Sequence, residues 1–121
     1  MKSITVEKII EIHDEVISSY EGTSGILSES TLAYLVYRLN RTKHVFRRAA
    51  LALYAIASQH PFMDGNKRTA LIVAENILGQ DGFFLAVGED QVVKFMLGVA
   101  SYQYGPGVIE KWIHNNAEKM E

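Results

Sequence analysis

Residues 49–70, AALALYAIASQHPFMDGNKRTA, decide the fold of this chain. The part up to residue 57 is apolar on every side of a helix, which is typical of a helix buried in the middle of a bundle. The polar part that follows holds a proline and a glycine, which predicts a loop, and another apolar helical pattern comes directly after it. The stretch therefore predicts a buried helix over residues 44–59, a loop, and a further helix over residues 66–78.

Amphipathic patterns on both sides of this stretch predict more helices. A helix capped by Ser28 has its apolar face at Leu32, Leu35, Val36 and Leu39. Gly79 and Gly82 are expected to end the helix over residues 66–78. The remaining predicted elements are helices over residues 5–20, 89–102 and 107–118, and an extended piece over residues 83–87. The prediction is an all-α protein, a compact single domain over residues 1–121 with about six helices.

Composition excludes several classes of protein. The 121 residues fit one domain, and an apolar fraction of 48% is enough to build a core. The chain has no cysteine, which excludes disulfides, a thiolate nucleophile and a cysteine zinc site. A net charge of −2 gives no case for a general nucleic-acid binder, so no direct DNA binding is expected. No apolar run approaches the roughly 20 residues that span a bilayer, and no signal peptide is recognised, so we expect a soluble cytoplasmic protein without membrane contact.

Two adjacent cations, Lys67 and Arg68, stand where a helix is expected to begin. Cations are disfavoured at a helix N-terminus because that end carries a partial positive charge. The arrangement becomes favourable when an anion lies between the cations and the free backbone N–H groups, and a phosphate group fits this description. The alternative is that both side chains are ordinary solvated surface cations.

His60 and Asp64 are the candidate reactive groups of the loop. Imidazole is well suited to accept a hydroxyl proton near neutral pH, and Asp64 is a candidate Mg²⁺ ligand, because Mg²⁺ usually takes only one or two protein carboxylates. Each residue also has a structural alternative: His60 as a cap of its own helix, and Asp64 as an ordinary residue at a helix start.

Gly65 and Asn66 complete the candidate anion cradle. Glycine permits close approach of the backbone to an anion, although an ordinary tight turn is the alternative. Asn66 is a good N-cap, and capping alone would explain it. Phe62 is expected to anchor the loop in the core. The pattern of a Walker A loop and the motifs of protein kinases are absent.

The segment HPFMDGNKRTA resembles the motif of the Fic/Doc family, and specifically its Doc (death-on-curing) branch. The general Fic pattern is HPFxDGNGRxxR. Lys67 stands at its second glycine and Leu71 at its second arginine, and both departures are typical of Doc. The segment IHDEVISSYEG in the first predicted helix also looks like the Doc N-terminus, so the resemblance covers most of the chain.

The resemblance implies a role for each motif residue. His60 would be the general base that activates a target hydroxyl, and Asp64 would hold Mg²⁺ on the phosphates of ATP. The implied phosphate-binding residues are Gly65, Asn66, Lys67 and Arg68. Fic enzymes transfer AMP, whereas Doc-like proteins carry the lysine and transfer the γ-phosphate, usually to a threonine of elongation factor Tu. The resemblance thus implies a kinase toxin that arrests translation, with AMP transfer or an inactive partner-binding relative as the alternatives.

An antitoxin is the other implied partner. Many Fic proteins carry an inhibitory helix of pattern [ST]-x-x-x-E-[GN], but Lys8 follows Glu7 where glycine or asparagine is required. The inhibitor is therefore expected to be a separate, Phd-like chain. Residues 38–48 hold five basic and no acidic residues, so this segment is a candidate docking groove, with a solvated basic face as the alternative. Residues 21–27 are interpreted as a connector, the alternative being a loop that helps to place the target.

Overall fold

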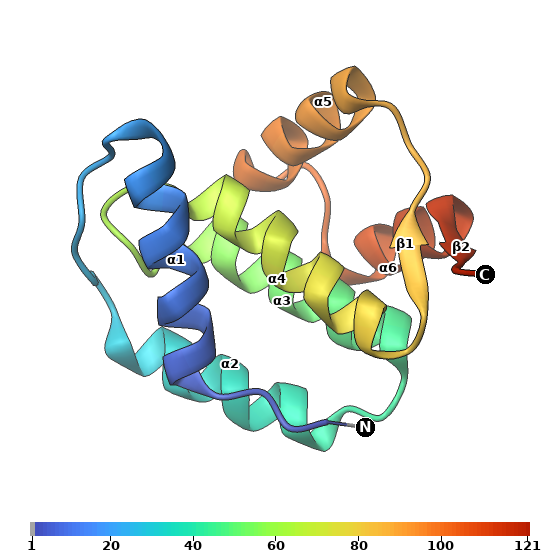
Figure 1. Cartoon of the computed structure of the whole chain (residues 1–121), viewed down its shortest axis with the longest axis horizontal. Helices are drawn as coiled ribbons and strands as arrows, with labels where there is room; N and C mark the ends of the chain where they lie inside the picture. The colour runs from blue at the N-terminus through green and yellow to red at the C-terminus, as the bar shows by residue number, and fades with distance from the viewer. Residues whose placement is uncertain (1) are drawn as a thin grey trace.

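The computed structural model describes residues 2–121, most of which belong to six α-helices (Figure 1). The elements are α1 (Val6–Tyr20), α2 (Glu29–Arg41), α3 (Val45–Gln59), α4 (Asn66–Gln80), β1 (Phe83–Leu85), α5 (Glu89–Ala100), α6 (Pro106–Asn116) and β2 (Ala117–Lys119). The all-α fold expected from the sequence is confirmed. Among the described residues, no helix is both long enough and apolar enough to cross a bilayer.

Helix α3 is the centre of the molecule. It packs along α4, and it also contacts α2, α5 and α6 (Figure 1). Every residue from Arg48 to Ser58 is buried except Tyr54, which is partly buried. The prediction of a buried central helix from its apolar sequence is therefore confirmed. The end of α3 and the start of α4 meet at one side of this core, which is where the motif loop lies.

Capping side chains fix the starts of the first two helices. The Oγ1 atom of Thr5 accepts a hydrogen bond of 3.1 Å from the Lys8 N–H. The Oγ atom of Ser28 accepts one of 3.1 Å from the Thr31 N–H. These bonds satisfy N–H groups that have no partner inside a helix. The expected cap at Ser28 is confirmed.

Three predicted helix ends were wrong. Helix α4 continues through Gly79 to Gln80, and Gly82, with φ 80°, forms the turn instead. Helix α6 ends at Asn116 because the next three residues form β2, which pairs antiparallel with β1. Helix α5 ends at Ala100, and two residues later Tyr102 adopts a left-handed φ of 64° that no α-helix continues through.

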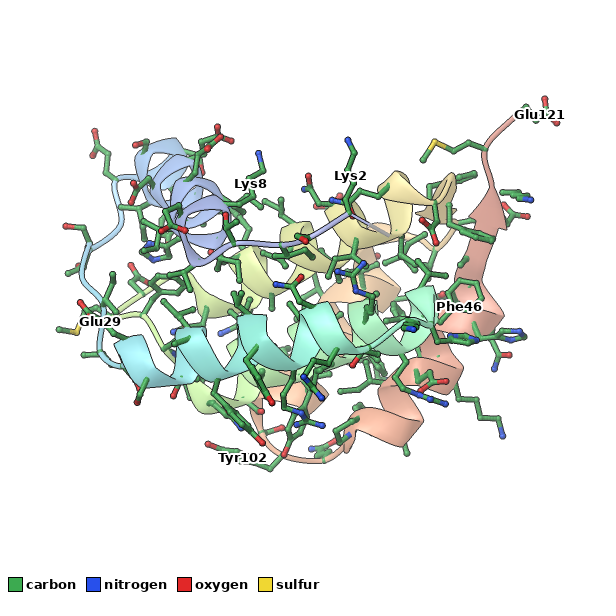
Figure 2. All side chains as sticks on the ribbon, turned by 90° about the horizontal axis from the view of Figure 1, so that it is seen from below. Lys2, Lys8, Glu29, Phe46, Tyr102 and Glu121 are labelled. Carbon is green, nitrogen blue, oxygen red and sulfur yellow. The ribbon has the colours of Figure 1, made fainter. Side chains whose placement is uncertain are left out.

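The N-terminal segment is tied to the rest of the molecule by polar bonds. Figure 2 shows the segment that carries Lys2 extending from α1 across the molecule, beside α2. The Ile4 N–H donates to Asn40 Oδ1, and Asn40 Nδ2 donates to the Ile4 carbonyl, both at 2.9 Å. Buried Arg48 donates through Nε to the Leu39 carbonyl and through a terminal nitrogen to the Lys2 carbonyl, both at 3.0 Å. Arg48 therefore joins α3 to α2 and to the N-terminal segment.

Candidate functional site

The motif loop connects two helices through two left-handed residues. His60 follows the last residue of α3 with φ 49° and ψ 61°, an uncommon conformation for a residue other than glycine. Its side chain is exposed and has no hydrogen-bond partner among residues 2–121. Gly65 has φ 76° and is the N-cap of α4, so the expected N-cap at Asn66 was wrong. The left-handed conformation explains why glycine is favoured at the cap position.

Buried contacts hold the loop from inside. Phe62 is fully buried and stacks on His13 of α1, with ring centroids 3.7 Å apart and an interplanar angle of 7°. The expectation that Phe62 anchors the loop is confirmed. The buried Asn66 side chain accepts from the Phe62 N–H at 3.0 Å and donates to the Phe62 carbonyl at 2.9 Å. The loop itself therefore occupies the oxygen and one N–H of this buried amide.

Residues 25–28 hold the loop from outside. The Met63 N–H donates to the Gly25 carbonyl at 2.9 Å, and the Leu27 N–H donates to the Pro61 carbonyl at 2.7 Å. Ile26 and Phe62 form an antiparallel bridge between these bonds. The segment interpreted as a connector thus lies against the motif, as a short extended piece running beside it.

Asp64 is held as a carboxylate by backbone donors. Its Oδ2 accepts from the Thr23 N–H at 3.0 Å, and its Oδ1 accepts from the Gly65 N–H at 2.8 Å. The Thr23 hydrogen bond is the main cause that lowers the pKa of Asp64 below its ordinary value, and the Tyr20 hydroxyl, the Gly65 N–H and His13 act in the same direction. Desolvation opposes them, but the net direction is downward. Asp64 is therefore ionised at neutral pH, as a metal ligand must be.

The first turn of α4 presents free donors and cations. The first intrahelical hydrogen bond runs from the Thr69 N–H to the Gly65 carbonyl at 3.0 Å. The N–H groups of Asn66, Lys67 and Arg68 come before this bond and have no acceptor among the described residues. Neither cationic side chain forms an ion pair within residues 2–121. The Arg68 guanidinium lies 5.3 Å from the centroid of the Tyr20 ring. This helix end has the features of an anion site.

These groups line one end of a groove of about 410 Å³. The sequence-predicted residues that line it are Asp64, Gly65, Asn66, Lys67 and Arg68. Apart from Tyr20 and Glu89, the other lining residues are apolar and come from α4 and α5: Leu71, Val92, Val93, Met96 and Leu97. A groove with convergent polar groups and apolar walls, in this range of volume, is typical of a small-molecule site. A hollow of about 620 Å³ beside the C-terminal strand includes no motif residue.

The structure brings five of the six predicted site residues to the groove and leaves one outside it. His60 is not part of the lining, although it lies four residues before Asp64. Tyr20 and the α5 wall line the groove but were not predicted as site residues. Val93 and Leu97 are 54% and 55% exposed, so the apolar surface of α5 is wider than its packing requires. This excess of apolar residues is the signal in the sequence from which the α5 wall could have been found.

The basic segment over residues 38–48 does not form one surface. Arg48 is buried, so its inclusion in an exposed docking groove was wrong. Arg38 and Arg41 are exposed on α2, where each guanidinium lies over a tyrosine ring of the same helix. Arg47 pairs with Glu110 of α6 at 3.2 Å. Only part of this segment therefore stays available to an acidic partner.

Comparison with known proteins agrees with this geometry. The Fic/DOC family matches residues 3–78, which include α1, the motif loop and most of α4. "Protein kinase doc" of Escherichia phage P1 is 33% identical over 88 residues, a match that covers 68% of this chain and 70% of the phage protein. The matched region holds every residue of the motif HPFMDGNKRTA, and the structure places five of them around one groove. This chain therefore belongs to the Fic/DOC family.

Proposed function

We propose that this protein is a Doc-like toxin kinase, which transfers the γ-phosphate of ATP to a hydroxyl group of a protein. The observation that carries the proposal is the polar end of the groove, where Asp64, two unpaired cations and three free N–H groups converge. The cations and N–H groups suit a chain of phosphates better than any uncharged ligand, because they interact favourably with negative charge, and the Asp64 carboxylate suits a metal ion bound to those phosphates. The similarity to a phage protein named a kinase supports the choice of reaction.

The α4 N-terminus is the proposed binding site for the phosphates. Lys67 and Arg68 supply charge, and the backbone N–H groups supply fixed donors that need no reorganisation. The apolar residues of α5 line the same groove and offer a surface to the nucleoside part of ATP. Lys67 and Leu71 stand where AMP-transferring Fic enzymes have glycine and arginine, and both residues line the groove. A bulky cation at position 67 crowds the place that an α-phosphate would need.

Mg²⁺ is the implied metal, and Asp64 fits it. Its carboxylate is ionised, and each oxygen accepts one backbone hydrogen bond, which leaves further lone pairs free. A single protein carboxylate is sufficient because Mg²⁺ takes its other ligands from water and from substrate phosphates. When bound, the ion would neutralise charge on the phosphates. Asp64 is the residue we propose to hold it.

His60 is the proposed general base. It would take the proton of the target hydroxyl while the hydroxyl oxygen forms a bond to the γ-phosphorus and the bond between that phosphorus and the β-phosphate oxygen breaks, releasing ADP. The imidazole is exposed at the end of α3, beyond the groove lining, where a large protein substrate has access to it. Its left-handed backbone is a form of strain that is common at functional sites.

We further propose that the target is a threonine of elongation factor Tu and that the modification arrests translation. A separate Phd-like antitoxin would hold the toxin in check. These two points rest on the Doc-type motif around Lys67 and on the similarity to the phage protein.

A label-transfer assay tests the reaction. The protein, Mg²⁺ and purified elongation factor Tu are mixed with ATP labelled at either the α- or the γ-phosphate. The expected result is label from the γ position alone, lost in His60→Ala and kept in His44→Ala, which removes another exposed histidine. Label from the α position would mean AMP transfer and would overturn the weight placed on Lys67. No label from either position would rule out elongation factor Tu as the target or indicate an inactive relative.

A further inference from the structure

Tyr20 is the residue of the groove that neither the motif nor the proposed reaction explains. It is the last residue of α1, its side chain is partly exposed, and it lines the groove beside Asp64 and Arg68. A tyrosine with no role at the end of a helix would be free to turn into solvent. This one instead lies beside three motif residues, Asp64, Gly65 and Arg68.

The first arrangement places Tyr20 and Asp64 against the same glycine, Gly22. A Cβ atom at Gly22 would lie 2.7 Å from Tyr20 Cζ and 2.9 Å from Asp64 Oδ2. The end of the phenol and the carboxylate therefore both approach the backbone at Gly22, from which the chain continues to the Thr23 N–H that binds Asp64. The hydroxyl also lowers the pKa of Asp64, while burial and Asp64 raise the pKa of Tyr20. The two groups therefore lie close enough for each to shift the pKa of the other.

The second and third contacts reach α4. The Tyr20 hydroxyl is 3.2 Å from the position of a Cβ at Gly65, the N-cap of that helix. The guanidinium of Arg68 lies over the face of the Tyr20 ring, 5.3 Å from its centroid, within the range of a cation–π interaction. One side chain of α1 thus lies beside the candidate metal ligand, the helix cap and a candidate phosphate ligand.

We propose that Tyr20 is a positioning residue, whose hydroxyl orients the Asp64 carboxylate and whose ring orients the Arg68 guanidinium for Mg²⁺–ATP. This inference rests on the proposed function, because it assigns a role within the same groove. The two parts of the side chain have separate effects. The hydroxyl acts on the metal ligand, and the ring acts on the cation that binds phosphate.

The test is calorimetry of ATP binding to the full chain at several Mg²⁺ concentrations. Tyr20→Phe removes the hydroxyl alone and is expected to raise the half-saturating Mg²⁺ concentration by about three- to tenfold, the usual effect of one hydrogen bond. Tyr20→Leu also removes the ring and is expected to weaken ATP binding by a further factor of about two to five. The matched controls are Tyr34→Phe and Tyr34→Leu, because Tyr34 on α2 also lies under an arginine but is remote from the groove.

A backbone variant tests the same arrangement without altering either side chain. The methyl group added in Gly22→Ala fits only if the phenol or the carboxylate moves. This variant is therefore expected to raise the Mg²⁺ requirement as Tyr20→Phe does. Gly88→Ala is the control, because a Cβ there meets nothing within 4 Å. This variant keeps the proposal testable if Tyr20→Leu fails to fold.

The outcomes separate this inference from the proposed function. An unchanged Mg²⁺ requirement in Tyr20→Phe, or an equal change in Tyr34→Phe, would overturn the positioning role. A wild-type protein that binds Mg²⁺–ATP but does not transfer γ-phosphate would overturn the proposed reaction alone. If the wild-type protein does not bind Mg²⁺–ATP, both are overturned.

Discussion

At the scale of single residues, the side chains of the motif divide into those that hold the loop and those that face the groove. Phe62 and Asn66 are buried and bind to the loop itself, whereas Lys67 and Arg68 are exposed and have no ion-pair partner among the described residues. Residues that are neighbours in the sequence therefore have different roles, because some hold the loop and others face the groove. Substitutions in the two groups should therefore change different quantities, stability in one case and ligand binding in the other.

Arg68→Ala tests the side that faces the groove. We expect it to weaken ATP binding by about 1–3 kcal/mol, because a hydrogen bond to a charged phosphate is lost, and to leave stability nearly unchanged. Isothermal titration calorimetry measures the affinity. Arg41→Ala is a close control, since that guanidinium also lies over a tyrosine ring, at 5.2 Å, but on α2. Equal ATP affinity of wild type and Arg68→Ala would contradict the phosphate-binding role.

Asn66→Ala tests the side that holds the loop. It removes two hydrogen bonds and leaves the N–H and carbonyl of buried Phe62 without partners, so the free energy of unfolding should fall by about 1–3 kcal/mol. Urea denaturation measures the change. Asn76→Ala serves as the control, because Asn76 is exposed on the same helix and bonds only to the Ile72 carbonyl within it. A similar loss of stability in both variants would contradict the role of the Asn66 side chain in holding the loop.

At the scale of elements, local signals in the sequence predicted what local contacts determine. The Ser28 hydroxyl oxygen accepts from the Thr31 N–H only three residues later, and the apolar run of α3 is buried as its composition indicates. The wrong prediction of the α6 end arises from a contact between segments that are distant in the sequence. Strand β2 forms because Ala117–Lys119 pairs with Phe83–Leu85, which lies more than thirty residues earlier, and no local sequence pattern predicts this pairing.

The groove also has a part determined by local sequence and a part determined by contacts between distant segments. Its polar end comes from five consecutive residues, 64–68, so the sequence alone brought these residues together. Tyr20 and the apolar wall come from α1 and α5, and only tertiary packing places them beside the motif. This is why the candidate phosphate-binding end was predicted from the sequence while the apolar wall was not.

Packing between α5 and the turn before α6 depends on a close approach at Gly98. The rings of Phe95 and Trp112 stack at 3.9 Å, and Tyr104 lies directly over Gly98. A methyl group at position 98 would collide with the Tyr104 ring, so Gly98→Ala should lower the free energy of unfolding by about 1–3 kcal/mol.

The matched variant for this prediction is Gly107→Ala. A Cβ at Gly107 meets nothing within 4 Å, and the residue lies in helix α6, so alanine should leave stability unchanged or raise it by up to about 1 kcal/mol. Thermal unfolding followed by circular dichroism compares the two variants. If Gly98→Ala proved as stable as Gly107→Ala, the tight contact with Tyr104 would not constrain the fold.

At the scale of the whole molecule, a buried cation links three segments of the chain. Arg48 of α3 donates to the carbonyls of Leu39, near the end of α2, and of Lys2, in the N-terminal segment, both at 3.0 Å. Burial lowers the pKa of its guanidinium, and Asp81 acts in the opposite direction. These hydrogen bonds, together with those between Ile4 and Asn40, hold the N-terminal segment that precedes α1 against α2 and α3.

Arg48→Met keeps the apolar stem and removes the donors. The Leu39 and Lys2 carbonyls then lose a charged partner, so we expect the free energy of unfolding to fall by about 1.5–3 kcal/mol, measured by urea denaturation. Arg47→Met changes the adjacent residue, whose exposed side chain forms an ion pair with Glu110, and should change stability by less than about 1 kcal/mol. Because Arg48 does not line the groove, ATP affinity should be the same in the folded variants and in wild type. Loss of ATP binding in folded Arg48→Met would show that the N-terminal segment is coupled to the groove through α1.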